Sequence, residues 1–107
     1  MQIEIKDLEF DTIIGILDFE RTTKQLVRVN CNIDYTYDDD FINYALVAQH
    51  IEDAMHHHKF ELIEQALLLL KVSLKKAFPL IQTLRLKISK PNILKNCEVA
   101  LSETTEY

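Results

Sequence analysis

The sequence predicts an α+β fold in which a four-stranded antiparallel sheet carries two helices on one face. Apolar and polar residues alternate near both ends of the chain, whereas apolar residues in the middle follow a helical period. The predicted element order is β-β-α-α-β-β, and grouped strands and helices of this kind favour an antiparallel sheet with helices on one side. The opposite sheet face is polar, so we expect it to meet water or a water-filled channel. At 107 residues the chain has the length of a single domain, 1–107.

The first two strands are predicted to form an antiparallel hairpin. Residues 3–16 alternate, but the apolar phase changes around Lys6-Asp7, which indicates a bulge or kink. Residues 25–35 alternate without interruption. Their apolar side consists of Val27, Val29, Cys31, Ile33 and Tyr35. The polar segment 18–24 joins the two runs, as the connection of a hairpin would.

Two helices are predicted next. Asp38-Asp39-Asp40 and Asn43 both carry short polar side chains that can cap free amides, so either can mark the first helix start. The second helix is expected from about Phe60 to Phe78, where Pro79 stops it. The apolar stripes are Ala45, Ala48, Ile51 and Met55 in the first helix, and Ile63, Ala66, Leu67, Leu70, Leu74 and Ala77 in the second. His56-His57-His58-Lys59 is the expected connection.

The last two strands are predicted at 83–90 and from Cys97 onward. The apolar side consists of Leu84, Leu86 and Ile88 in the first of these strands, and of Cys97, Val99 and Leu101 in the second. Lys90 shares the parity of the apolar residues, so it either snorkels to the rim or is held in a pocket. Cys31 and Cys97 have no metal-type spacing, which favours reduced core thiols in a reducing compartment.

Composition excludes several classes of function. Lys plus Arg number 12 against 17 Asp plus Glu, and this net charge of −5 argues against a nucleic-acid binder. The longest apolar run, 66–70, falls far short of the roughly 18 residues that a membrane helix needs. Since the N-terminus lacks the pattern of a signal peptide, we expect a cytoplasmic protein. The single glycine, Gly15, excludes glycine-rich phosphate loops, so side chains must carry any chemistry.

The histidine run does not predict a metal site. His56, His57 and His58 are consecutive, and on a helix consecutive side chains diverge by about 100°. They therefore cannot point three nitrogens at one tetrahedral zinc ion. We expect a solvated turn and no metal.

Four further residues stand out, and each also has a plain structural explanation. Glu20 lies in a polar segment, where a solvated loop charge is the default. Tyr44 opens the first helix, and its ring can pack on the core with a wet hydroxyl. Glu64 lies in the first turn of the second helix, where a carboxylate favours the helix dipole. Lys90 has the two alternatives given above.

Together with the segments around them, these residues give a sequence that resembles the dihydroneopterin aldolase family. The matching segments are Ile3-x-Ile5-x-Asp7-Leu8, Ile13-Ile14-Gly15-Ile16, Asp18-Phe19-Glu20-Arg21 with Gln25, Asn43-Tyr44, Phe60-x-Leu62-Ile63-Glu64 and Lys87-Ile88-Ser89-Lys90-Pro91. The resemblance implies the family's tunnelling fold, in which subunits close their sheets into a barrel around a channel. Octamer and tetramer remain open.

The resemblance also implies roles for the ring-binding residues. Glu64 would accept hydrogen bonds from the 2-amino group and ring N–H of a pterin. The backbone at Ile63 would add a contact. Tyr44, arriving from a neighbouring subunit, would close the ring pocket and relay a proton.

Three residues would serve the hydroxylated side chain of the substrate. Glu20 and Lys90 would contact it, with Lys90 as the principal general acid and base. Gln25 would help to place a water. Two departures from the family, a short segment before Tyr44 and Asn92-Ile93-Leu94 after Pro91, affect the pocket wall.

The implied activity is that of a carbon–carbon lyase, a cofactor-free aldolase of folate biosynthesis. It would cleave 7,8-dihydroneopterin into 6-hydroxymethyl-7,8-dihydropterin and glycolaldehyde. Two alternatives stay open: an epimerase of dihydroneopterin or its triphosphate, and a non-catalytic oligomeric pterin-binding module.

Overall fold

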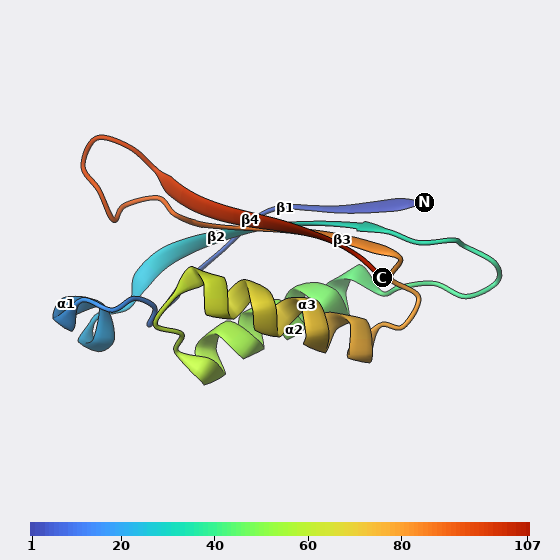
Figure 1. The fold of residues 1–107 in the computed structure, drawn as a ribbon, viewed down its shortest axis with the longest axis horizontal. Helices are drawn as coiled ribbons and strands as arrows, with labels where there is room; N and C mark the ends of the chain where they lie inside the picture. The colour runs from blue at the N-terminus through green and yellow to red at the C-terminus, as the bar shows by residue number, and fades with distance from the viewer.

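The computed structural model describes residues 1–107 and confirms the predicted α+β fold. In Figure 1 a twisted antiparallel sheet forms one layer, and the two long helices form a second layer across one of its faces. The strands are ordered β1-β2-β3-β4. The elements are β1 (Gln2–Thr12), α1 (Asp18–Thr22), β2 (Gln25–Asp34), α2 (Tyr44–His58), α3 (Ile63–Ala77), β3 (Thr83–Lys90) and β4 (Val99–Glu106).

The first hairpin has the predicted bulge. The register of β1 against β2 shifts between Ile5 and Leu8, and Asp7 has a φ of 54°. The displaced amide of Asp7 donates a hydrogen bond of 2.9 Å to Asn30 Oδ1 on β2. The strand ends at Thr12 rather than at residue 16, because the chain turns at Gly15 with a φ of 128°.

The core lies between the sheet and the two long helices. It follows the predicted alternation, with the inward side chains of β2 and β3 fully or almost fully buried. The helices contribute Val47, Ile51, Met55, Ala66, Leu67, Leu70 and Leu74. Burial of one such large apolar side chain stabilises the fold by about 1.5–3 kcal/mol. The other sheet face carries polar residues such as Arg85 and Lys87, which are exposed.

The helix boundaries decide between the two predicted starts. Asn43 is the cap of α2, and its side chain accepts hydrogen bonds from the amides of Ala45 and Leu46. The prediction that 56–59 forms the connection is wrong, because all three histidines lie in the last turn of α2. The helix ends at His58, and the next residue, Lys59, caps it with a left-handed φ of 48°. The second helix begins at Ile63 rather than at residue 60.

Two further predictions need correction. Segment 18–24 is not a plain loop, since Asp18–Thr22 forms the short helix α1. Cys97 is exposed and precedes β4, because the connection after Lys90 continues to residue 98. Cys31 is buried as expected, and desolvation raises the pKa of its thiol to about 12. No helix of the fold has the length and apolar character needed to cross a membrane.

Candidate active site

An ion pair joins two distant segments at one end of the molecule. Lys90 Nζ at the end of β3 lies 2.9 Å from Glu20 Oε2 in α1. Their side chains are only 12% and 3% exposed, respectively. Lys90 is thus withdrawn from solvent against Glu20 and does not snorkel to the rim, which decides between its two predicted alternatives. A solvated loop charge was the wrong expectation for Glu20, because α1 turns its carboxylate inward.

The short helix explains how Glu20 points inward. Glu20 is the third residue of α1, and its Oε1 accepts a hydrogen bond of 3.2 Å from the amide of Leu17, the residue before the helix. A carboxylate that reaches back in this way satisfies an amide that the helix itself leaves free. The cap therefore fixes the carboxylate beneath the turn at Gly15.

Glycine is required at position 15. A Cβ atom there would lie 2.0 Å from Glu20 Cδ, well inside van der Waals contact. The backbone φ of 128° is also one that residues with side chains rarely adopt. The single glycine of the chain thus provides the space that the Glu20 carboxylate occupies.

Gln25 holds the same carboxylate from a third side. Its Nε2 donates to Glu20 Oε2 at 2.7 Å and to the carbonyl of Ile14 at 2.7 Å. Gln25 begins β2, so the first strand of the core anchors it. The structure thus brings together three of the predicted site residues: Glu20, Gln25 and Lys90.

Opposing effects set the pKa of Glu20. Burial raises the pKa, whereas hydrogen bonds from Lys90, Gln25 and the Leu17 amide, together with the Lys90 charge, lower it. The lowering effects prevail, and the pKa lies below the ordinary value of 4.5. The site therefore holds a charged carboxylate beside an amine, which suits it to bind hydroxyl groups and to exchange protons.

Glu64 lines a separate hollow at the end of the molecule where α1 and the end of β3 lie (Figure 1). It is exposed in the first turn of α3 and lines a hollow of about 300 Å³ with residues of α3 and β4. Leu101 on the β4 side pairs with Ile88, and Lys90 pairs with Val99. Along β4, the backbone of Leu101 is thus offset by two residues, or about 7 Å, from that of Val99, the partner of Lys90. Ile63 is buried and begins α3, so the helix offers free amides here.

Tyr44 lies at the other end of the molecule. It begins α2, and Figure 1 shows that this end of α2 lies opposite to α1, to the start of α3 and to the end of β3. Tyr44 is 66% exposed, so the expectation of a ring packed on the core is wrong. It lines a second hollow of about 480 Å³ with the start of β1. One subunit alone does not bring Tyr44 to the Glu20–Lys90 pair.

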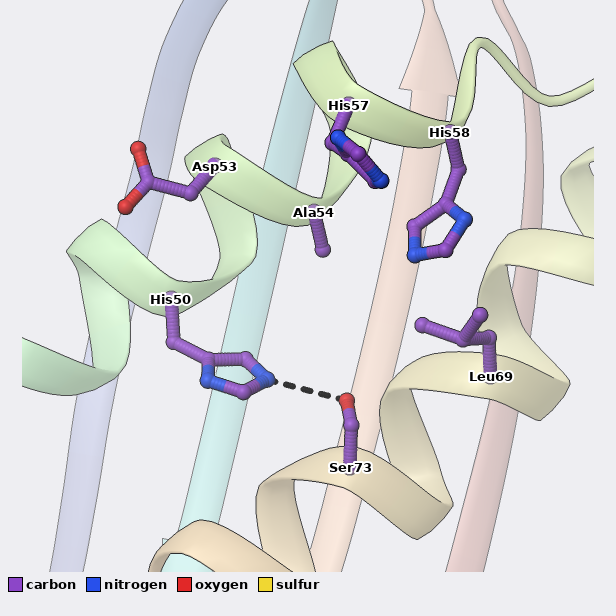
Figure 2. A pocket seen from close by; sticks show the side chains of 7 residues that line it. All are labelled: His50, Asp53, Ala54, His57, His58, Leu69 and Ser73. Carbon is purple, nitrogen blue, oxygen red and sulfur yellow. Dashed lines mark hydrogen bonds between the residues drawn. The ribbon is translucent and has the colours of Figure 1, made fainter.

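A third hollow of about 290 Å³ lies between α2 and α3. Figure 2 shows a hydrogen bond between His50 and Ser73. His57 and His58 face the hollow, whereas Asp53 points away from it. The His50 Nε2 and Ser73 Oγ atoms are 2.9 Å apart. No group of three or more His, Cys, Asp or Glu side chains is placed to hold a metal ion.

Comparison with protein families matches residues 3–103 to the family described as FolB, dihydroneopterin aldolase. The chain belongs to the dihydroneopterin aldolase family. This membership confirms the resemblance on which the site residues were selected. It makes the chain a member of an enzyme family that acts on pterins in folate biosynthesis.

Solved structures share the fold of this dihydroneopterin aldolase family member. A FolB protein of Vibrio cholerae matches with a TM-score of 0.90 and 22% identity over 100% of this chain and 98% of that chain. The dihydroneopterin aldolase of E. coli, in complex with neopterin, matches with 0.87 and 21% over 98% of each chain. A dihydroneopterin aldolase of Burkholderia, bound to guanine, matches with 0.80 and 17% over 100% and 91%. Comparison with curated protein sequences finds no match.

The sequence did not reveal two contacts of the candidate site. It did not connect Gly15 to Glu20, although a single glycine five residues before a candidate carboxylate was an available signal. It also assigned no role to Arg21, whose guanidinium bonds only to backbone carbonyls. No local pattern could reveal this, because two of those carbonyls come from residues 59 and 60.

Proposed function

We propose that residues 1–107 form one domain of a lyase that cleaves 7,8-dihydroneopterin by a retro-aldol reaction. The products would be 6-hydroxymethyl-7,8-dihydropterin and glycolaldehyde. The observation that carries this proposal is the buried pair of Glu20 and Lys90, with Nζ and Oε2 2.9 Å apart, at the same end of the molecule as the Glu64 hollow. A binding module would have no need for a sequestered amine next to a charged carboxylate.

Glu64 is the proposed anchor of the pterin ring. The 2-amino group and adjacent ring N–H of a pterin present two parallel donors, which match the two oxygens of a carboxylate. Neopterin and guanine, the ligands of the two related structures, both carry this edge. Each charge-assisted hydrogen bond contributes about 1.5–3 kcal/mol. The backbone at Ile63 would contact the ring beside it.

Glu20 and Lys90 would serve the hydroxylated substituent. The C6=N5 imine of the dihydropterin accepts the electrons of the broken C1′–C2′ bond as an enamine, so the protein has to move only protons. Lys90 would take the proton of the 2′-hydroxyl once its own ammonium has released a proton to solvent, and C2′ would leave as the aldehyde carbon of glycolaldehyde. A proton then returns to C1′ from Lys90, relayed by Tyr44. General acid–base help of this kind contributes about 10²–10⁴-fold.

Glu20 would hold the substrate hydroxyls and the Lys90 ammonium in one arrangement. Gln25 is the proposed support of this carboxylate, and a water placed for proton transfer would lie against the same two side chains. Both hydrogen bonds of Gln25 Nε2 are short at 2.7 Å, so the carboxylate has little freedom to turn away. This positioning supplies the remainder of the rate acceleration.

The site would be completed by a neighbouring subunit. Glu64 lies in a hollow on the β4 edge of the sheet, and Tyr44 lies in a hollow on the β1 edge. If the β4 edge of one copy meets the β1 edge of the next, both hollows join and neither edge strand is left unpaired. Repetition of one such head-to-tail contact closes a ring. A measurement of molecular mass in solution would distinguish eight subunits from four.

Product chromatography tests this proposal. Purified protein is incubated with 7,8-dihydroneopterin in the presence of a chelator, and we expect equal amounts of the two cleavage products. Mainly the 2′-epimer would indicate the related epimerase, which rejoins the same fragments. No turnover would indicate the pterin-binding module.

A further inference from the structure

Arg21 connects the two parts of the candidate site. Its Nη1 donates to the carbonyls of Gly15 and Phe60 at 3.1 and 3.2 Å, and its Nη2 donates to the carbonyl of Lys59 at 2.9 Å. In addition, the Gly15 amide donates to the same Phe60 carbonyl at 3.0 Å. The turn that contains Gly15 is thereby tied to the connection between α2 and α3.

The two tied segments lead directly to different functional side chains. Gly15 makes the space for Glu20, the partner of Lys90. Phe60 precedes the start of α3, where Ile63 and Glu64 lie. Arg21 therefore bridges the segment that carries the acid–base pair and the segment that carries the ring-binding carboxylate.

Arg21 and Arg28 differ in what their guanidinium groups contact. The chain has a net charge of −5, yet Arg21 forms no salt bridge, whereas Arg28 lies near Asp7, Glu9 and Glu98. Three backbone carbonyls accept hydrogen bonds from the Arg21 guanidinium instead. The planar fork of arginine can serve several fixed acceptors at once, which the single ammonium of lysine cannot do in the same geometry.

We propose that Arg21 is a positioning residue that sets the separation between the Glu20–Lys90 pair and Glu64. The inference rests on the proposed function, because the separation matters for a substrate whose ring and hydroxylated substituent are held at the two ends. Without the fork, the hydrogen bond from the Gly15 amide to the Phe60 carbonyl remains, but this single bond holds the two ends less firmly at the distance that the substrate requires.

The variants Arg21→Ala and Arg21→Lys test the proposal. Arg28→Ala, which removes a different arginine, is the control. In both Arg21 variants we expect kcat for 7,8-dihydroneopterin to fall by about 10–100-fold, because small misplacements of reacting groups have effects of this size. The affinity for guanine, which contains only the ring edge, should remain unchanged. Hydrogen exchange at the Gly15 amide should become faster, and Arg28→Ala should change none of these quantities.

Each result has a defined meaning. If kcat and Gly15 exchange are unchanged in Arg21→Ala, or if Arg21→Lys restores both, the positioning role is wrong. If guanine binding and kcat fall together with the melting temperature, Arg21 is only structural. If unmodified protein binds guanine but does not cleave dihydroneopterin, the proposed function fails, and this is seen before any variant is compared.

Discussion

Lys90 Nζ and Glu20 Oε2 lie 2.9 Å apart although 70 residues separate them in the chain. The contact joins the end of β3 to the short helix α1, and both side chains are withdrawn from solvent. A buried ion pair is by itself weak evidence for stability, since desolvation offsets much of the attraction. Its place at the same end of the molecule as the Glu64 hollow, in a member of the dihydroneopterin aldolase family, supports the proposed acid–base role.

Lys90→Ala should strongly reduce turnover while leaving pterin binding intact. The proposed ring anchor at Glu64 is unaffected, but the proposed proton-exchanging group is removed, so kcat should fall by about 10²–10⁴-fold. Steady-state kinetics and equilibrium binding of guanine measure the two effects separately. Lys87→Ala, on the exposed sheet face of the same strand, is the control. Near-normal rates in Lys90→Ala would refute the role of Lys90.

Gly15→Ala should displace the Glu20 carboxylate and destabilise the fold. The added Cβ would clash with Glu20, and the positive φ adds a cost of about 1–3 kcal/mol. Chemical denaturation of a double-mutant cycle with Glu20→Ala separates these two causes. We expect Gly15→Ala to be less destabilising in the Glu20→Ala background, by about 0.5–3 kcal/mol, since the clash is then absent. Additive effects would contradict the steric explanation.

Glu20 should make stability depend on pH in the acid range. Its pKa is lowered on folding, so its stabilising contribution is fully present above about pH 4.5, the ordinary value, and is lost as the pH falls through the folded pKa. Denaturation curves at several pH values should show a smaller loss of stability below pH 4.5 in Glu20→Gln than in the unmodified protein. Glu61→Gln, at an exposed position, is the control. An identical pH profile in Glu20→Gln would contradict the prediction.

The two cysteines should differ sharply toward alkylating reagents. Cys97 is exposed, whereas Cys31 is buried and burial raises its pKa to about 12. At pH 8 in the folded state we expect rapid labelling of Cys97 and protection of Cys31, because the thiolate is the reactive form. Peptide mass spectrometry identifies the labelled residue. Equal labelling of both, without unfolding, would be inconsistent with the buried thiol.

Mixed oligomers should reveal whether Tyr44 acts across subunits. Tyr44→Ala and Lys90→Ala chains should each be inactive alone, but co-expressed chains should recover activity. For a random ring in which each site uses Lys90 of one subunit and Tyr44 of the next, roughly a quarter of the sites would be intact. No recovery in a verified mixed oligomer would contradict a shared site.

The fold was predictable because its signals are local. Alternation identified the four strands, the phase change at Lys6-Asp7 identified the bulge, and the parity of Lys90 placed this lysine on the apolar side. These features depend only on side-chain direction, which the period of each element determines. Glu64 in the first turn of its helix was found in the same way.

The rest of the site depends on contacts that no local pattern records. Glu20 was interpreted as a loop charge, because the polar composition of 18–24 hides the short helix that turns it inward. Arg21 bonds to carbonyls about 40 residues away, which no side-chain pattern encodes. Cys97 was placed on a strand because one alternation continued past its true boundary. Tyr44 is exposed in a single subunit, so its role depends on contacts between copies.

The most direct test of the account follows the proton that the site delivers to C1′. The protein is incubated with 7,8-dihydroneopterin and a chelator in D₂O, and the products are separated and analysed by mass spectrometry and NMR. We predict 6-hydroxymethyl-7,8-dihydropterin with one deuterium bound to C1′, together with an equal amount of glycolaldehyde. Absence of this product, or its formation without deuterium on C1′, would contradict retro-aldol cleavage by the Glu20–Lys90 site.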